Sequence, residues 1–174
     1  PISLEEHIKD SVMEEQAKLG FRKEVIRLYY PVGMLNNLFG TACDAEEMQQ
    51  ALAGFTDFAK ERLGEVTITH KKDRFCLLLP EETSIYVHEH KKENEFIHQL
   101  VNLIASHETD MEQVKKLFEQ QPFPSVVEQT TGGEFDTVIH FTQGDDRYYY
   151  CFKDEGFHIT YHRFLPADYK DLGV

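Results

Sequence analysis

The sequence has no long hydrophobic run, which excludes membrane-spanning helices at the outset. Its longest apolar stretches are a few residues, such as Cys76 to Leu79, whereas a helix that crosses a bilayer needs about 20 apolar residues. The first residues, PISLEEHIKDS, are acidic where a secretory signal would be basic and then apolar. We therefore expect no export signal in them and no association with membranes.

Cysteine is scarce as well. Cys43, Cys76 and Cys151 lie far apart and form no CxxC or CxH spacing, so neither a disulfide framework nor a zinc knuckle is indicated. Unpaired cysteines are typical of a reducing compartment, and we expect a cytoplasmic protein.

Positive charge is also in short supply, with 18 Lys and Arg against 31 Asp and Glu and a formal net charge of -13. The excess of negative charge is spread along the whole chain, so the electric field of the protein repels phosphate backbones. We therefore expect no binding to nucleic acid. The basic clusters Lys71 to Arg74 and Lys91-Lys92 are too short to reverse this. The acidic surface maintains solubility, and it could also attract a basic protein partner.

Local catalytic signatures are missing. The chain has no GxGxxG, no GxxxxGK[ST], no GxSxG, no HExxH and no EF-hand loop, each of which would place phosphate-binding amides, an exposed nucleophile or paired ligands at one point.

The length and composition that remain are those of an ordinary globular protein. With 174 residues, 41% hydrophobic and 28% charged, the chain can bury one substantial core. We therefore expect a single domain over residues 1–174, in which the turn at residues 122–124 is the only plausible internal boundary.

Capping residues and apolar periodicity predict five helices. They cover residues 4–19 and 31–39, a stretch from the capping residue Asp44 to Gly64, residues 95–107 and a stretch that begins at Thr109. Runs rich in β-branched and aromatic residues predict strands between and after them. These runs are residues 24–30, 65–70, 74–79, 84–90, 125–130, 134–142, 147–153 and 157–164.

The order of these elements indicates the fold class. Strands and helices come in blocks without regular βαβ alternation, which favours an α+β fold. We expect an antiparallel sheet that includes a C-terminal four-strand meander, with several helices packed on one face.

One segment resembles a known family. The stretch FRKEVIRLYYPVGMLNNLFG, residues 21–40, together with the overall length, resembles a family of uncharacterised bacterial proteins of unknown function. The resemblance carries no catalytic motif and implies no activity.

The C-terminal meander gathers most of the reactive side chains. Alternate residues of a strand point to opposite faces, so Ile139, Tyr150 and Phe152 share one face with Phe157 and Tyr161, which we expect to be the core side. The opposite face collects the side chains of His140, Tyr149, Cys151, His158 and His162.

Imidazole and thiolate groups are preferred ligands of zinc, and three of them with an open position could activate a water molecule. His158 and His162 are about 13 Å apart along a strand, so the better trio is His140 and Cys151 with one of the two. The alternative is that these are solvated or hydrogen-bonded side chains on an outer face.

The remaining histidine, tyrosine and acidic groups are expected to have structural roles or to be solvated. His88 and His90 would be about 7 Å apart on one face of a strand, too far for direct chelation without a third group. We expect Tyr148 to Tyr150 to serve core packing more than stacking on a ligand. The acid pairs Glu81-Glu82 and Asp145-Asp146 are expected in solvated turns.

Three functions remain open. The first is a non-catalytic domain without cofactors that binds a protein or small-molecule ligand. The second is a metal-assisted hydrolase with zinc at His140, Cys151 and His158 or His162. The third is a structural subunit of a larger assembly.

Overall fold

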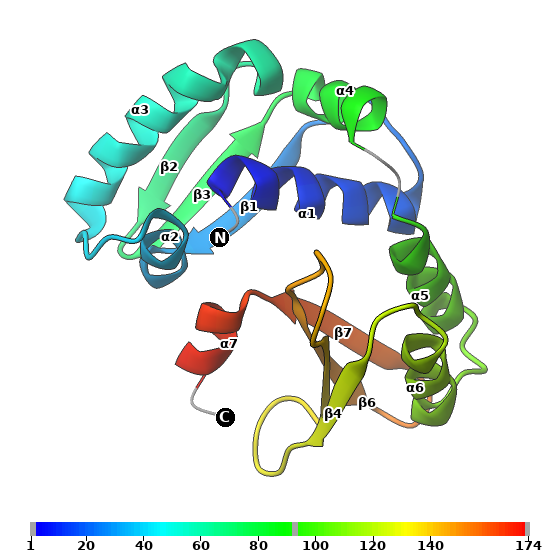
Figure 1. Cartoon of the computed structure of the whole chain (residues 1–174). Helices are drawn as coiled ribbons and strands as arrows, with labels where there is room; N and C mark the ends of the chain where they lie inside the picture. The colour runs from blue at the N-terminus through cyan, green and yellow to red at the C-terminus, as the bar shows by residue number, and fades with distance from the viewer. Residues whose placement is uncertain (1–2, 92–93, 173–174) are drawn as a thin grey trace. The chain divides into compact units, whose positions relative to one another are not determined.

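A computed structural model of the chain describes residues 3–91 and 94–172, which form seven helices and two antiparallel sheets (Figure 1). The mixed content confirms the α+β class. The chain divides into two compact units, Pro1–Glu93 and Asn94–Val174, called here the N-terminal and the C-terminal unit. The turn at residues 122–124 lies inside the C-terminal unit, and the single domain over residues 1–174 stays a prediction. No helix within the described ranges is long and apolar enough to cross a bilayer.

The N-terminal unit contains four helices and three strands among its described residues. In chain order they are α1 (Leu4–Leu19), β1 (Ile26–Pro31), α2 (Val32–Phe39), α3 (Ala45–Leu63), β2 (Thr67–Lys71), β3 (Arg74–Leu79) and α4 (Glu81–His90). The predicted caps begin the two long helices. The Ser3 hydroxyl accepts a hydrogen bond from the Glu6 amide, and Asp44 and Glu47 exchange both bonds of a capping box.

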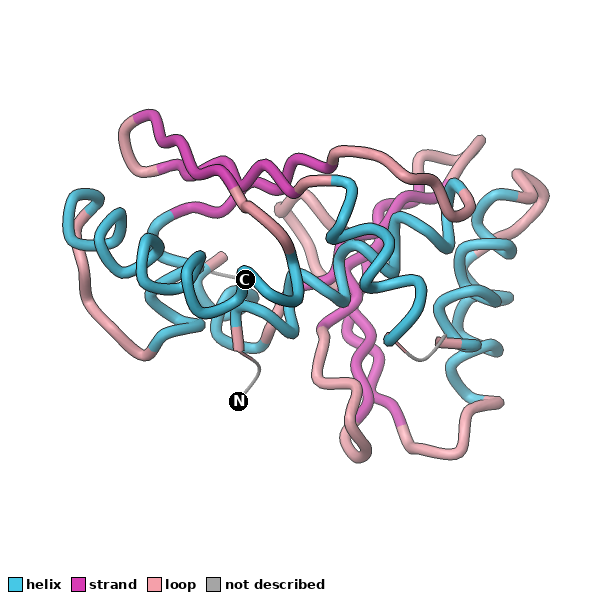
Figure 2. The backbone as a smooth tube through the Cα atoms, turned by 90° about the horizontal axis from the view of Figure 1, so that it is seen from above, coloured by secondary structure: helices cyan, strands magenta, loops and turns pink. Residues whose placement is uncertain are grey.

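The three strands form a sheet in the order β1-β3-β2 with helices against one face (Figure 2). Alternate side chains of β3 determine which face the helices cover. Phe75, Leu77 and Leu79 are fully buried, while Arg74, Cys76 and Leu78 point to the other side. The buried face packs against apolar residues of all four helices, among them Ile8, Leu35, Leu52 and Val87. The opposite face of this sheet is thus left without a helix from its own unit.

The strand predicted over residues 84–90 is wrong, because these residues belong to helix α4. Pro80 precedes the helix and Glu81 and Glu82 occupy its first turn, where acidic side chains stabilise a helix dipole. Its buried side is partly polar. The Thr83 hydroxyl donates to the Leu63 carbonyl and the Ser84 hydroxyl donates to the Glu24 carbonyl. Because polar residues occupy the buried side of α4, its sequence lacks the apolar periodicity by which a helix is recognised.

The C-terminal unit begins with two helices and continues into the predicted meander. Its elements are α5 (Glu95–Ala105), α6 (Met111–Glu119), β4 (Ser125–Gln129), β5 (Thr137–Phe141), β6 (Tyr149–Asp154), β7 (Ile159–Phe164) and α7 (Pro166–Asp171). The strand order β4-β5-β6-β7 confirms the antiparallel meander. Asp110, and not Thr109, caps α6, since its carboxylate accepts the Gln113 amide. Helix α7 was not predicted.

Aromatic side chains join the meander to α5 and α6. The Phe118 ring, fully buried on α6, lies 4.9 Å from Phe96 of α5 and 5.3 Å from both Phe141 and Tyr150. Edge contacts of this kind add to the free energy of burying large rings. The face of the sheet that carries Tyr150 and Phe152 is therefore the core side, as strand parity predicts. Phe157 is an exception, because it lies outside β7 and is 73% exposed.

Candidate functional site

Three of the four proposed metal ligands lie on the second face of the C-terminal sheet. Cys151 of β6 is directly opposite His162 of β7, and His140 of β5 is opposite Tyr149 of β6. Directly opposite residues of antiparallel strands share a face, so the parity prediction holds for these three. His158 lies before β7, and its Nε2 is 3.5 Å from the Glu155 carboxylate in the preceding turn.

Helix α7 and a row of stacked rings occupy this face. The His140 ring stacks on Tyr149 at 4.2 Å between ring centres, and Tyr149 stacks on Tyr169 of α7 at 4.6 Å. Cys151 has no exposed surface, and burial raises the pKa of its thiol to about 12. A thiol with so high a pKa is protonated at neutral pH, which makes it a poor nucleophile.

The metal hypothesis gains no geometric support from this arrangement. Within residues 3–91 and 94–172, no three His, Cys, Asp or Glu side chains come together as a group that could hold a metal ion. Zinc at His140, Cys151, His158 and His162 stays a prediction that rests on the sequence.

The other residues singled out in the sequence, the histidines of α4 and the tyrosine run, pack against neighbouring side chains. His88 and His90 lie on helix α4, where residues two apart do not face each other, and they stack on Phe21 and Tyr86. Tyr148 and Tyr150 are buried, so the tyrosine run serves mainly core packing. The Asp146 carboxylate accepts hydrogen bonds from the Tyr148 amide and the Tyr150 hydroxyl, which fixes the turn before β6.

A cleft with mostly apolar walls lies in the N-terminal unit, and we call it the α1–α3 cleft. It has a volume of about 600 Å³, within the range of ligand-binding clefts. Its lining comes from the start of α1, the end of α2 and one face of α3: Ser3, Leu4, Glu5, Leu38, Phe39, Ala51, Phe55, Phe58 and Arg62.

Helix periodicity places the wall of the cleft on α3. Ala51, Phe55, Phe58 and Arg62 follow one another at intervals of four, three and four residues, which aligns them along one side of the helix. The neighbouring side, with Met48, Leu52, Ala59 and Leu63, is fully buried in the core. Phe58 lies just off that buried side and is 72% exposed. The sequence analysis missed this site, and the signal that could have found it is an aromatic residue next to the apolar stripe of this helix.

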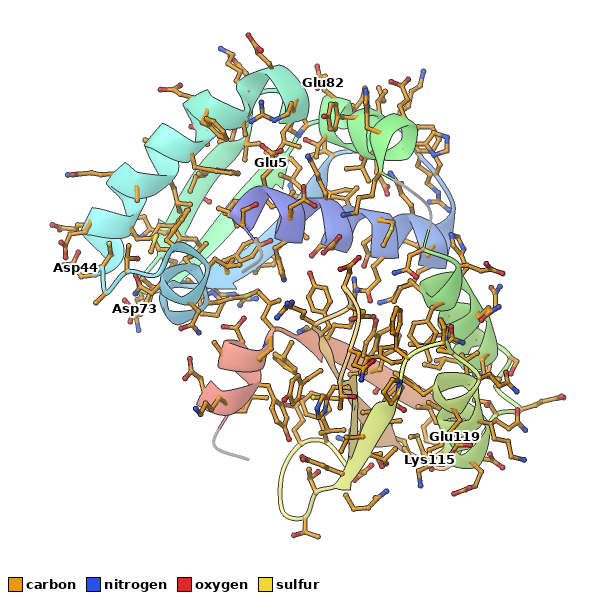
Figure 3. The ribbon with its side chains drawn as sticks, in the orientation of Figure 1. Glu5, Asp44, Asp73, Glu82, Lys115 and Glu119 are labelled. Carbon is orange, nitrogen blue, oxygen red and sulfur yellow. The ribbon has the colours of Figure 1, made fainter. Side chains whose placement is uncertain are left out.

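An ion pair closes one end of the cleft. The Arg62 Nε and Nη2 atoms both donate to the Glu5 carboxylate, at 2.8 to 3.1 Å, and Nη2 also donates to the Phe58 carbonyl. The guanidinium carbon is 4.8 Å from the centre of the Phe58 ring, a cation–π distance. Figure 3 shows Glu5 on α1, which faces α3 at this point. The contacts hold Arg62 and Phe58 in place at the rim.

Two opposing influences determine the ionisation of Glu5. Burial raises the pKa of its carboxyl, but hydrogen bonds from Arg62 and Lys9 and their charges outweigh that effect, and the net pKa lies below its usual value. Glu5 is therefore ionised at neutral pH. The cleft thus combines apolar walls with one neutralised ion pair and with Ser3, whose hydroxyl caps α1.

The described residues thus form an α+β fold with an apolar cleft in the N-terminal unit. The chain belongs to a family described as a domain of unknown function from an E. rectale gene, DUF3877, whose family model matches residues 2–173. This membership confirms the resemblance to an uncharacterised bacterial family. No curated protein and no solved structure matches the chain significantly.

Proposed function

We propose that this chain is a non-catalytic binding domain whose α1–α3 cleft receives apolar side chains from a segment of a partner protein. The observation that carries the proposal is Phe58, a phenylalanine 72% exposed at the rim of an apolar cleft. Aromatic residues and arginine dominate the binding energy of protein interfaces, and here Phe58 and Arg62 are held together by a cation–π contact.

The exposure of Phe58 favours a protein segment over a small ligand. Small-molecule sites enclose most of the ligand surface, whereas a side chain that projects from the rim can be covered only by a larger partner. A helix that places two or three apolar side chains in a groove is one established way to achieve this.

Acidic side chains on the exposed part of α3 indicate the composition of the partner. Glu46, Asp57 and Glu61 are exposed on α3, and in the part of the chain that the structure describes none of them is in an ion pair. A partner segment with Lys or Arg beside its apolar residues would gain from these charges, mainly in its rate of association.

The remaining expectations belong to the same proposal. A cytoplasmic location is supported by three cysteines that are all free thiols. The excess of 31 acidic over 18 basic residues supports a function without nucleic-acid or membrane binding.

The proposal can be tested with a display library of random 16-residue peptides selected on the wild-type protein. Selected peptides should carry apolar residues at helical spacing together with Lys or Arg. Phe58→Ala should weaken their binding at least ~10-fold, about 1.4 kcal/mol, while thermal unfolding changes by less than about 0.5 kcal/mol because the ring is exposed.

Phe157→Ala is a matched control, since Phe157 is 73% exposed and lies in the C-terminal unit. It should leave peptide binding unchanged. An equal loss of peptide affinity in Phe58→Ala and Phe157→Ala would contradict the proposal. Selected peptides that bind Phe58→Ala as tightly as wild type would contradict it as well.

A further inference from the structure

The uncovered face of the N-terminal sheet carries cations in a protein that is otherwise rich in acids. The residues that point to this face are Arg27, Tyr29 and Pro31 of β1, Arg74, Cys76 and Leu78 of β3, and Thr67, Thr69 and Lys71 of β2. We call this set the basic sheet face. It has three basic residues and no acidic one, although acids outnumber bases in the whole chain by 31 to 18.

The sheet register puts these cations from three strands on one face, with Arg27 opposite Leu78, four positions along β3 from Arg74. Lys71 and Arg74 are directly opposite each other, and Arg74 is also opposite Pro31 of β1. Like charges in directly opposite positions destabilise a sheet. A bound anion would remove that cost.

None of the three cations is neutralised within the described ranges. Arg27, Lys71 and Arg74 are exposed, and no carboxylate of residues 3–91 or 94–172 forms an ion pair with any of them. Asp73 lies in the adjoining hairpin turn, where its carbonyl accepts the Val32 amide (Figure 3). In this unit Lys9, Lys60, Arg62 and Lys91 do contact a carboxylate.

Tyr29 contacts the Arg74 guanidinium on the side of Pro31 that is nearer to Arg27. The guanidinium carbon of Arg74 lies 4.4 Å from the centre of the Tyr29 ring, which holds the charge near the middle of β1. The Cα atoms of Tyr29 and Arg27 are about 7 Å apart along the strand. An extended peptide repeats its side chains on one side at the same interval of about 7 Å.

We propose that the basic sheet face binds an acidic, extended segment of a partner protein, with carboxylates at alternate positions paired to Arg27 and Arg74. The planar guanidinium group suits bidentate recognition of carboxylate. The surrounding net charge of -13 disfavours a polyanion as long as a nucleic acid, because most of its phosphates would lie outside the basic patch. This surface is distinct from the α1–α3 cleft, and the proposal does not depend on that site.

The test uses fluorescence anisotropy with the labelled peptide (Glu-Thr)5, which presents a carboxylate at every second residue, at low ionic strength. The peptide should bind the full chain, and added salt should weaken binding because the contacts are charge pairs. The double variant Arg27→Gln/Arg74→Gln should lose at least ~10-fold in affinity, more than the ~2- to 3-fold scatter expected of exposed sites. Thr69→Glu, which adds an internal anion to the face, should weaken binding as well.

The matched control is Lys116→Gln/Lys170→Gln, which removes the same charge from exposed positions of the C-terminal unit. It should bind the peptide as wild type does. Equal losses in the two double variants, or no binding at millimolar peptide, would overturn the proposal. It would also fail if a single-stranded oligonucleotide of equal charge bound more tightly through the same arginines, or if sedimentation showed that these arginines hold two copies of the chain together.

Discussion

At the scale of single residues, burial controls which reactive groups are available. Cys151 shows the effect, because the fold removes it from solvent and raises the pKa of its thiol to about 12. Cys43 and Cys76 are only partly buried. The same residue type therefore has different reactivity at three positions, although the sequence alone presents the cysteines as equivalent.

Thiol labelling should reveal this difference. With a disulfide reagent at neutral pH, Cys43 and Cys76 should react in the native protein, while Cys151 should react only as fast as the chain unfolds. Adding urea should abolish the protection. In the Cys151→Ala variant the slow phase should be missing, and equal labelling rates for all three native thiols would show that the buried position of Cys151 is wrong.

At the scale of elements, the contacts between helices account for the positions of the cleft residues. The Glu5–Arg62 pair joins α1 to α3 across the end of the cleft, and the Thr83 and Ser84 hydroxyls attach α4 to its neighbours. These are contacts between residues 20 to 60 positions apart. Such contacts cannot be predicted from local sequence patterns, which cover only a few neighbouring residues.

The Glu5–Arg62 pair should make stability depend on acid pH. Because the folded-state pKa of Glu5 is lowered from its usual value of 4.5, the unfolded chain binds a proton more readily than the native one. The stabilisation is therefore complete above about pH 4.5 to 5 and is lost as pH falls through the lower folded-state pKa. Glu5→Gln should cost up to about 1 kcal/mol at pH 7 and progressively less below pH 4.5.

Urea unfolding followed by circular dichroism from pH 7 to pH 3 measures this difference. Glu65→Gln is the control, since its partner Lys60 and its own carboxylate are largely exposed, and salt should reduce its effect more strongly. A constant gap between wild type and Glu5→Gln over the whole pH range would contradict the assignment.

At the scale of the whole molecule, the family membership and the two units are established while the activity is a proposal. The described residues provide an apolar cleft and a basic sheet face in the N-terminal unit, and a layer of stacked aromatic rings in the C-terminal unit.

Metal and redox conditions provide a test at this scale. Neither a reductant nor a chelator such as EDTA should shift the melting temperature, because the three cysteines are free and the described residues form no group of three metal-ligating side chains. Differential scanning calorimetry and elemental analysis of the purified protein would check this. Near-stoichiometric zinc, with a melting temperature lowered by chelation and by His140→Ala, would instead support the metal-assisted hydrolase.

Much of the fold could be predicted from local patterns. Capping residues and 3.6-residue periodicity located α1, α3 and α5, and turn residues with alternating apolar positions located the β2–β3 hairpin and the meander. Parity also placed His140, Cys151 and His162 on one face. The strand expected over residues 84–90 failed because α4 buries Thr83 and Ser84 through distant carbonyl partners, which apolar periodicity cannot detect.

The sequence by itself determined the fold class, the strand faces and the acidic surface, because these depend on composition and on neighbours within a few residues. Only the tertiary structure decided which of the reactive side chains are accessible and where the surfaces lie. The α1–α3 cleft needs three helices at once. The basic sheet face needs Arg27 and Arg74, 47 positions apart in the chain, to lie on the same face through the β1–β3 register. Such surfaces arise from contacts over long sequence separations, and only packing of the core fixes them.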